Sequence, residues 1–262
     1  MLYPKIDTLF KRDPVTFKVL PGEFTEEKYS LISEWEWTEK IDGTNIRVMY
    51  SPETLFEAGI NPEYEWRDMD GRIEDIHSHM GIGGRTPDAQ IPSGIYDYIT
   101  RVLSSDKLRE VFGDKDVVIF GEGYGDKIQN NGEGSYLLSD DPIRQKFIVF
   151  DICIGGKFWL KRADVEEVCE KLGLDVVPIV EIPETESAVY YNTYCPDNPI
   201  DSAVIFVEKG FKSKLGDGSK DAEGLIGRTS IPLFDALGRR LIVKLKTCDF
   251  REGKVKKGKK ND

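Results

Sequence analysis

Long hydrophobic runs are absent from this sequence of 262 residues. No apolar stretch approaches the roughly 18–20 residues that a membrane-spanning helix requires, and the first residues lack the apolar core of a signal peptide. The four cysteines are scattered without paired spacing. Because thiols stay reduced in the cytosol, we expect a cytoplasmic protein with no membrane partner.

Histidine is also scarce, with His77 and His79 as the only two. They alternate as some zinc ligands do, but no cysteine pair accompanies them, so we do not expect a zinc site. A Ser-His-Asp triad would need a nucleophile-elbow context that the sequence lacks, and nothing supports a Cys–His pair. The sequence therefore disfavours these routes to metal binding and nucleophilic catalysis.

Positive charge is outnumbered, because 36 Lys and Arg face 47 Asp and Glu, for a net charge of −11. This balance argues against a general nucleic-acid binder, since phosphate contacts dominate such affinity. Locally the balance reverses at residues 251–262, and Lys209, Lys212 and Lys214 form a second basic group. Such patches could hold a nucleic acid on an acidic body, although the tail fits a disordered solubilising end equally well.

The pattern of apolar residues predicts both helices and strands. Residues 93–111 and 162–172 each have one apolar face and are predicted to be helices. Ser93 is the expected N-cap of the first helix, and Gly173 the expected stop of the second. Residues 124–146 are predicted to form a long loop near the candidate site. Strands are predicted at 46–50, 117–121, 147–152, 203–208 and 241–246.

Helices interspersed with strands in no regular alternation favour an α+β fold with antiparallel sheets over a doubly wound parallel sheet. The length fits one large domain. We therefore predict a single domain over residues 1–250 and a basic, disordered tail over residues 251–262.

The most informative segment of the chain reads EKIDGTN and contains Lys40. In an extended chain, Lys40 lies on the opposite face from Trp35 and Trp37. Asp42-Gly43 is expected to turn the chain, because glycine takes φ > 0 at no steric cost. The ammonium of Lys40 is expected at the end of a strand that leads into a turn, beside the carboxylates of Glu39 and Asp42. This position suits chemistry on a phosphate. Lysine can act there as a covalent nucleophile when its amine is neutral.

Four more motifs follow the lysine in order. They are Phe120-Gly121-Glu122-Gly123, Phe147-Ile148-Val149-Phe150-Asp151-Ile152, Glu223-Gly224-Leu225-Ile226 and Val243-Lys244-Leu245-Lys246. Together with Lys-x-Asp-Gly-x-Asn, they resemble, in order, the nucleotidyltransferase motifs of ATP-dependent polynucleotide ligases. Asn45 at the end of the first motif is more similar to RNA ligases. The opening Tyr3-Pro4-Lys5-Ile6 also resembles the start of phage-type, RNA ligase 2-like enzymes, so the resemblance covers nearly the whole chain.

The resemblance implies a nucleotidyltransferase (adenylyltransferase) domain of antiparallel sheets flanked by helices, with the adenylate pocket between the sheets. It implies that Lys40 takes AMP from ATP, giving covalent lysyl-AMP and pyrophosphate. AMP would then pass to a 5′-phosphate end of RNA, and a 3′-hydroxyl end would displace it. ATP and Mg²⁺ would be the cofactors, with Mn²⁺ able to substitute, and RNA would be the partner.

The same resemblance assigns the charged residues of the motifs to the phosphates and the metal. Lys244 and Lys246, on one face of a strand, would hold the α-phosphate and stabilise its transition state, because phosphoryl-type transfer depends on positioning and positive charge. Glu223 and Asp42 would hold Mg²⁺, directly or through its waters.

The remaining motif residues would bind the nucleoside. Glu122 would accept a hydrogen bond from the ribose or align a metal-bound water. Asn45 and the backbone around Glu39 and Ile41 would recognise ribose and adenine. Phe150 would stack on the base, since an aromatic face suits a purine.

An arginine is expected shortly after the lysine motif, where it would bind phosphate or ribose. Arg85 is the first choice, because its Gly-rich surroundings let backbone approach a ligand. Arg47 and Arg72 are the alternatives. Arg228 is expected to reach the nucleic acid or the triphosphate.

Simpler interpretations stay open. Phe147 and Phe150 could both be core residues, and Lys244 and Lys246 could lie on the solvated face of an edge strand. For the whole chain, the alternatives are a DNA ligase, a GTP-using capping-type guanylyltransferase, and a non-catalytic protein that binds nucleotides or RNA ends. Only sixteen residues follow Lys246, too few for the extra C-terminal domain of many ligases, so an accessory protein or domain could act in trans.

Overall fold

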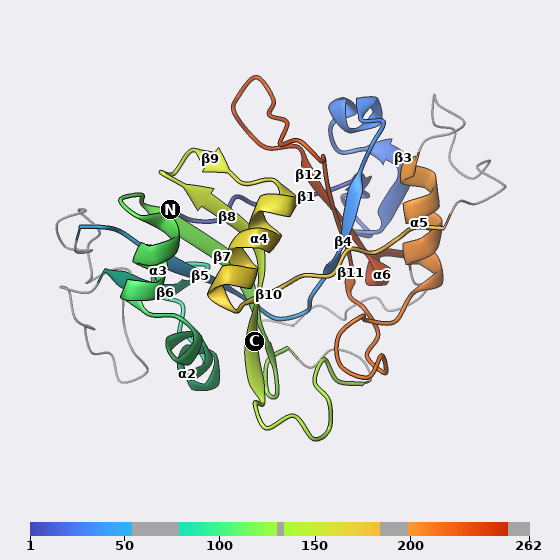
Figure 1. The fold of residues 1–262 in the computed structure, drawn as a ribbon. Helices are drawn as coiled ribbons and strands as arrows, with labels where there is room; N and C mark the ends of the chain where they lie inside the picture. The colour runs from blue at the N-terminus through green and yellow to red at the C-terminus, as the bar shows by residue number, and fades with distance from the viewer. Residues whose placement is uncertain (54–78, 130–133, 184–198, 251–262) are drawn as a thin grey trace, which may run out of the picture.

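The computed structural model describes residues 1–53, 79–129, 134–183 and 199–250. Two β-sheets, each with its own helices, make up this part of the chain (Figure 1). The mixture of mostly antiparallel sheets and helices confirms the α+β class. None of the described helices is long and apolar enough to cross a membrane.

The larger sheet has six strands, in the order β10-β8-β7-β5-β6 with β9 beside β8. All neighbours are antiparallel except β10 and β8. The strands are β5 (Thr44–Tyr50), β6 (Met80–Gly84), β7 (Val117–Gly125), β8 (Gln145–Ile154), β9 (Phe158–Trp159) and β10 (Asp175–Val176). The strands predicted at 46–50, 117–121 and 147–152 are thus confirmed as parts of β5, β7 and β8.

Three helices pack against the larger sheet: α2 (Ser93–Val102), α3 (Ser105–Phe112) and α4 (Arg162–Leu172). Their apolar faces share one core with β5, β7 and β8, in which Ile95, Leu108 and Leu172 are fully buried. Each such side chain contributes roughly 1.5–3 kcal/mol by leaving water. The helix predicted at 162–172 is confirmed, and it ends at Gly173 in the left-handed conformation (φ 65°, ψ 35°).

The smaller sheet runs in the order β1-β12-β11-β4. Its central strand β11 is antiparallel to both neighbours, and the edge strand β1 is parallel to β12. The strands are β1 (Asp7–Thr8), β4 (Glu36–Lys40), β11 (Gly224–Arg228) and β12 (Ile242–Lys246). A second core joins this sheet to the hairpin and helices around it, which are β2 (Phe10–Arg12), β3 (Val19–Phe24), η1 (Glu27–Leu31), α5 (Pro199–Lys209) and α6 (Thr247–Phe250).

The strand predicted at 203–208 is wrong, because these residues belong to α5. Ile200, Ala203, Val204 and Val207 are all fully buried. Their spacing is that of one helix face, which packs on the smaller sheet. The run of β-branched residues concealed this period, and burial of the face outweighs their strand propensity.

The single helix predicted at 93–111 is in fact two helices. The chain becomes extended at Ser104 (φ −137°, ψ 160°), whose side chain accepts a hydrogen bond from the backbone N–H of Lys107 at 3.2 Å. Ser104 is therefore the N-cap of α3. Ser93 is not a cap, because Pro92 occupies the N-cap position of α2 and no side chain caps that helix.

Ser104→Ala should lower the free energy of unfolding by about 1 kcal/mol, because the first turn of α3 loses its capping acceptor. Ser93→Ala is the matched control and should change it by less than about 0.5 kcal/mol. Chemical denaturation of both variants measures the difference. Equal effects of the two substitutions would contradict the assignment of the cap.

Candidate active site

A cavity of 530 Å³ lies where the chain crosses from β4 in the smaller sheet to β5 in the larger one. Both sheets contribute to its walls, so a pocket between the sheets is present. All eleven site residues predicted from the sequence line this one cavity: Glu39, Lys40, Ile41, Asp42, Asn45, Arg85, Glu122, Phe150, Glu223, Lys244 and Lys246.

The three lysines reach the cavity from β4 and β12, the two strands that flank β11 in the smaller sheet. Lys40 on β4 and Lys246 on β12 both pair in register with Gly224 of β11. A Cβ on Gly224 would lie 2.0 Å from a backbone oxygen of β12, so only glycine allows this close approach. Lys244 lies one pleat further along β12, and its Nζ donates to the carbonyl oxygen of Ile6 at 2.7 Å. The solvated-edge alternative is therefore excluded, because β12 is an inner strand with both lysines in the cavity wall.

Glu223 connects two of these lysines. One of its carboxylate oxygens accepts a hydrogen bond from Lys40, and the other pairs with the Nζ of Lys246 at 2.5 Å. Burial lowers the pKa of Lys246, but its hydrogen bond and ion pair with Glu223 outweigh this effect and raise it. An ion-paired amine carries a proton, which Lys40 would have to lose before acting as a nucleophile.

Lys244 is in the opposite electrostatic situation. Its pKa is lowered, first by burial and then by the repulsion of neighbouring cations, which are Lys246, Lys40, Lys5 and Arg85. An anionic group placed among these cations would relieve the repulsion. This wall of the cavity is therefore suited to a phosphate.

The wall formed by the larger sheet carries a half-buried carboxyl group. Glu122 of β7 pairs in register with Asn45 of β5, and both side chains line the cavity. Burial raises the pKa of Glu122 to about 8, and the carboxylates of Glu223 and Asp42 act in the same direction, against the effect of Lys40. Glu122 is consequently protonated at neutral pH and able to donate a hydrogen bond.

The turn between β4 and β5 forms for a different reason from the one expected. Gly43 does not adopt a positive φ. A Cβ on Gly43 would lie 2.2 Å from the carbonyl oxygen of Gly123 and 2.8 Å from Cγ of Glu122. The glycine is needed because the connecting segment lies directly against β7. The next contact is also tertiary, since the backbone N–H of Asp42 donates to the hydroxyl of Tyr136 at 3.0 Å.

The two phenylalanines of β8 have different roles in the structure. Phe120 pairs with Asp151 and Gly121 pairs with Val149, which leaves Phe150 as the extra residue of a β-bulge. The ring of Phe150 lines the cavity, whereas Phe147 is fully buried in the core of the larger sheet. The core interpretation therefore holds for Phe147 only.

Among the arginines, Arg85 and Arg228 line the cavity. Arg47 is buried elsewhere and donates to the carbonyl oxygen of Met1 at 3.0 Å. A Cβ on Gly83 would lie 2.9 Å from the guanidinium of Arg47, so this glycine makes room for an arginine and not for a ligand. Arg72, together with the tail and His77, lies outside the described residues.

A buried polar cluster behind Phe150 was not predicted. Asp151, which is 1 % exposed, accepts hydrogen bonds from the hydroxyl of Tyr3 at 2.8 Å and from Arg240 at 2.6 Å. Nε of Arg228 lies 3.9 Å from the same carboxylate. Since β8 belongs to the larger sheet and Arg228 to β11 of the smaller one, this cluster ties the two sheets together behind the cavity.

Other cavity residues were missed because their sequence context gives no signal. Gln129 and Val177 lie in loops and line the cavity. Tyr3 belongs to a recognised opening motif, but only the structure shows its ring edge-on to Phe150, with centroids 4.9 Å apart. Two lysines of the expected basic group also have structural roles, since Lys212 pairs with Asp221 and Lys214 donates to the carbonyl oxygen of Ile179.

The carboxylates of the cavity suit a hard divalent cation. Asp42, Glu122 and Glu223 supply oxygen donors only. Within the described residues, no three His, Cys, Asp or Glu side chains converge into a ready-made metal centre. Mg²⁺ characteristically binds through one or two carboxylates, substrate phosphates and retained waters. The donor set therefore fits Mg²⁺ bound together with a nucleotide.

Comparison with protein families identifies the class of this protein. A family model described as RNA ligase matches residues 33–246. The chain therefore belongs to the RNA ligase family, which confirms the resemblance of the five motifs. A search of curated proteins found no match to this sequence.

Solved structures of Naegleria gruberi RNA ligase share the fold. A lysine variant with ATP and Mn is 16% identical, with a TM-score of 0.52, and the match covers 93% of this chain and 62% of that one. The same ligase with pyrophosphate is also 16% identical, with a TM-score of 0.50, and the match covers 93% of this chain and 61% of that one. An apo aspartate variant is 16% identical, with a TM-score of 0.51, and the match covers 95% of this chain and 62% of that one. The nucleotidyltransferase fold is therefore confirmed. This chain spans about three fifths of the length of those proteins.

Glu122→Gln should change how stability depends on pH. Because folding raises the pKa of Glu122 from 4.5 to about 8, the folded state keeps a proton that the unfolded state has lost. The unfolding free energy of the wild type should therefore fall as pH rises from about 5 to 8, through this carboxyl group alone.

The glutamine variant lacks that contribution, so its unfolding free energy should fall less as pH rises from about 5 to 8. Denaturant titrations at pH 5 and pH 8 measure both proteins, and all other titrating groups are common to them. The same loss of stability in both proteins would contradict a protonated Glu122.

Proposed function

We propose that this chain is an ATP-dependent RNA ligase that works through a covalent lysyl-AMP at Lys40. The observation that carries the proposal is the convergence of the motif residues. Side chains separated by up to two hundred positions, from Glu39 to Lys246, line one cavity between two sheets. Its volume of 530 Å³ lies in the range of small-molecule sites.

In the first step, Nζ of Lys40 attacks the α-phosphorus of ATP. The N–P bond forms as the P–O bond to pyrophosphate breaks, and the amine proton is lost. Lys244 and Lys246, on β12 across β11 from Lys40, hold the oxygens of the α-phosphate, where negative charge develops. When bound, Mg²⁺ neutralises phosphate charge, and Glu223 and Asp42 are the residues that would hold it.

The nucleoside is recognised on the side of the larger sheet. Phe150 presents its ring to the base, and Asn45 with Glu122 meets the ribose. The Oε2 atom of Glu39 accepts a hydrogen bond from the backbone N–H of Lys214 at 2.9 Å, while its Oε1 is buried without a hydrogen-bond partner among the described residues. That oxygen accepts a hydrogen bond from the amino group of adenine. Guanine offers a carbonyl oxygen at the same place, so Glu39 favours ATP over GTP.

The second and third steps transfer the adenylate. A 5′-phosphate oxygen of RNA attacks the phosphorus of lysyl-AMP, which frees the lysine and leaves an adenylylated 5′ end. A 3′-hydroxyl then attacks that phosphate, and AMP leaves. The acidic body is no obstacle to RNA binding if the positive charge around Lys244 is where the RNA end lies.

The organisation of the protein is part of the proposal. Residues 1–250 form one adenylyltransferase domain, followed by a basic tail. RNA is the proposed partner, and an accessory protein or domain that acts in trans on some substrates remains part of the proposal. In the part of the chain that the structure describes, Cys153, Cys169 and Cys248 are free thiols, which suits a reducing compartment such as the cytoplasm.

Incubation with ATP labelled in the α-phosphate should label the wild-type protein covalently. Lys40→Ala should abolish the label, because no other amine replaces Nζ at the α-phosphorus. Lys115→Ala, at an exposed lysine away from the cavity, is the matched control and should label fully. GTP should label the wild type poorly. Labelling of Lys40→Ala, or a wild type that takes no label, would remove the proposal.

Removal of divalent cations should abolish the label with the same protein preparation. Chelation with EDTA should stop labelling, and added Mg²⁺ should restore it, with Mn²⁺ able to substitute. Circular dichroism should stay unchanged throughout, since the hydrophobic clusters that hold the described fold together consist of apolar side chains. Labelling that persists in EDTA would contradict a role for the carboxylates as metal ligands.

A further inference from the structure

A second cavity, of 640 Å³, lies beside the candidate active site. Tyr3, Pro4 and Ile6 line both cavities, so a single segment of chain separates them. The other walls come from the turn before β9 and from the loop over residues 229–241, between β11 and β12. Figure 1 shows this loop and β9 projecting at the same upper side of the molecule. Nothing in the proposed chemistry of ATP uses this cavity.

Positive charge dominates its lining. Asp7 is the one carboxylate in the described lining, against five cations: Lys5, Lys28, Lys157, Arg239 and Arg240. Three of these cations form ion pairs with carboxylates outside the lining. Lys28 and Arg239 pair with Asp235, and Arg240 pairs with Asp151. Lys5 and Lys157 are exposed, and within the described part of the chain neither side chain forms an ion pair. These two lysines give the cavity its net positive charge.

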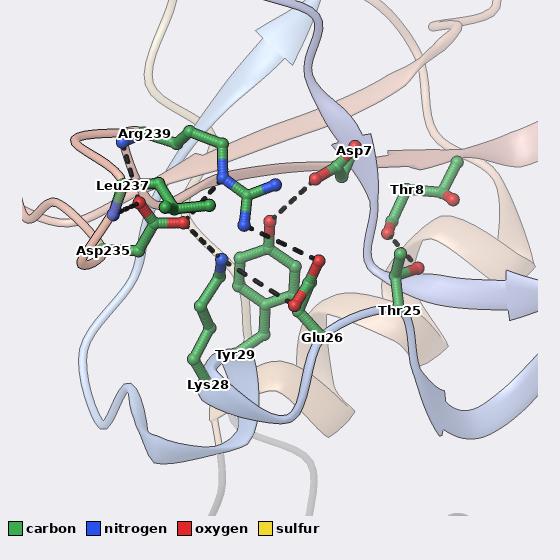
Figure 2. A network of polar contacts seen from close by, with 9 residues as sticks. All are labelled: Asp7, Thr8, Thr25, Glu26, Lys28, Tyr29, Asp235, Leu237 and Arg239. Atoms are coloured by element: carbon green, nitrogen blue, oxygen red, sulfur yellow. Dashed lines mark hydrogen bonds and ion pairs between the residues drawn. The ribbon is translucent and has the colours of Figure 1, made fainter.

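The wall formed by the loop over residues 229–241 is held in a fixed shape. Asp235 accepts hydrogen bonds from the backbone N–H groups of Leu237 at 2.9 Å and Arg239 at 2.8 Å. Figure 2 shows the same carboxylate joined to Lys28 and the side chain of Arg239. These hydrogen bonds lower the pKa of Asp235, so the network keeps its charge at neutral pH. The cavity is therefore formed before any ligand arrives.

Aromatic rings supply the rest of the surface. Phe234 lines the cavity with 48% of its area exposed. Trp159 lines it as well, and its other contacts fix the ring, since Arg240 lies 4.2 Å above it and Phe120 stacks on it at 5.6 Å. Aromatic faces next to unpaired cations are the features with which proteins hold single-stranded nucleic acid, because every base has a π face and every linkage a charge.

The positive charge continues into the active site. Lys5 lies on the segment between the cavities, and its charge is one of those that lower the pKa of Lys244. The carbonyl oxygen of Ile6, the next residue, accepts the hydrogen bond that positions Lys244. A polyanion could follow this line of cations from one cavity into the other.

We propose that the second cavity holds an unpaired nucleotide of the RNA strand next to the end being joined. The base stacks on the exposed ring of Phe234 and meets the edge of Trp159, whose ring is already stacked on by Phe120 and covered by Arg240. The adjoining phosphate contacts Lys157 and Lys5. This inference rests on the proposed function, because it names where that function binds its RNA.

The test measures RNA binding and self-adenylylation separately on Lys157→Ala and Phe234→Ala. Lys5 stays unchanged, because its charge acts on Lys244. Fluorescence anisotropy with a short 5′-phosphorylated single-stranded RNA, without ATP, should show a Kd raised roughly fivefold to a hundredfold for Phe234→Ala, the range for loss of one stacked base. Lys157→Ala should weaken binding and reduce the slope of log K against log salt by about 0.7, the value for one phosphate contact on a single strand.

Matched controls are Lys115→Ala and Phe17→Ala, which change an exposed lysine and an exposed phenylalanine outside both cavities. Both should bind RNA as the wild type does. All four variants should take label from ATP at the wild-type rate, since none lies in the cavity around Lys40. Unchanged RNA affinity in both cavity variants, or an equal loss in the controls, would overturn the inference. Absence of labelling in the wild type would instead remove the proposed function.

Discussion

The buried carboxylate of Asp151 is the contact on which the geometry of the cavity depends. It lies on β8 of the larger sheet and pairs with Arg228 of β11 in the smaller sheet and with Arg240 of the loop before β12. Buried ion pairs add little net stability, but a missing partner leaves an uncompensated charge that costs about 3–5 kcal/mol. The two sheets can therefore separate only at high cost. The distance between the lysines on one wall and Phe150 on the other is set by this constraint.

Within the cavity, the three lysines outnumber the single carboxylate of Glu223, which pairs with two of them. An incoming phosphate would complete the charge balance. Glu223 pairs with both Lys40 and Lys246, so its single charge leaves one of their two positive charges uncompensated, and Glu122 carries a proton because burial raises its pKa. Among the described residues, Lys244 has a carbonyl oxygen as its hydrogen-bond partner, and neighbouring cations repel it. A bound polyphosphate would take over the lysines and leave the carboxylate of Glu223 for a cation. One carboxylate can thus serve the lysines before the nucleotide enters and a metal afterwards.

The sequence was most informative where chemistry restricts the residue type. A lysine before Asp-Gly or two lysines on one strand face has simpler explanations when taken alone. The five motifs in order restricted the site, and all eleven predicted residues line one cavity. The sequence was least informative where tertiary contacts decide which residue or which secondary structure a position requires. The need for Gly43 depends on the position of Gly123, and α5 is a helix because its apolar face meets a sheet that is distant in sequence. Neither contact is visible in a local window of residues.

The N-terminal segment shows how one short stretch can serve several parts of the structure at once. Tyr3 donates to the carboxylate that ties the sheets and lies edge-on to Phe150. Three residues later, the carbonyl oxygen of Ile6 holds Lys244, and β1 then joins the smaller sheet beside β12. The same residues separate the two cavities. Displacement of this segment would therefore alter the aromatic wall, the position of Lys244 and the second cavity together.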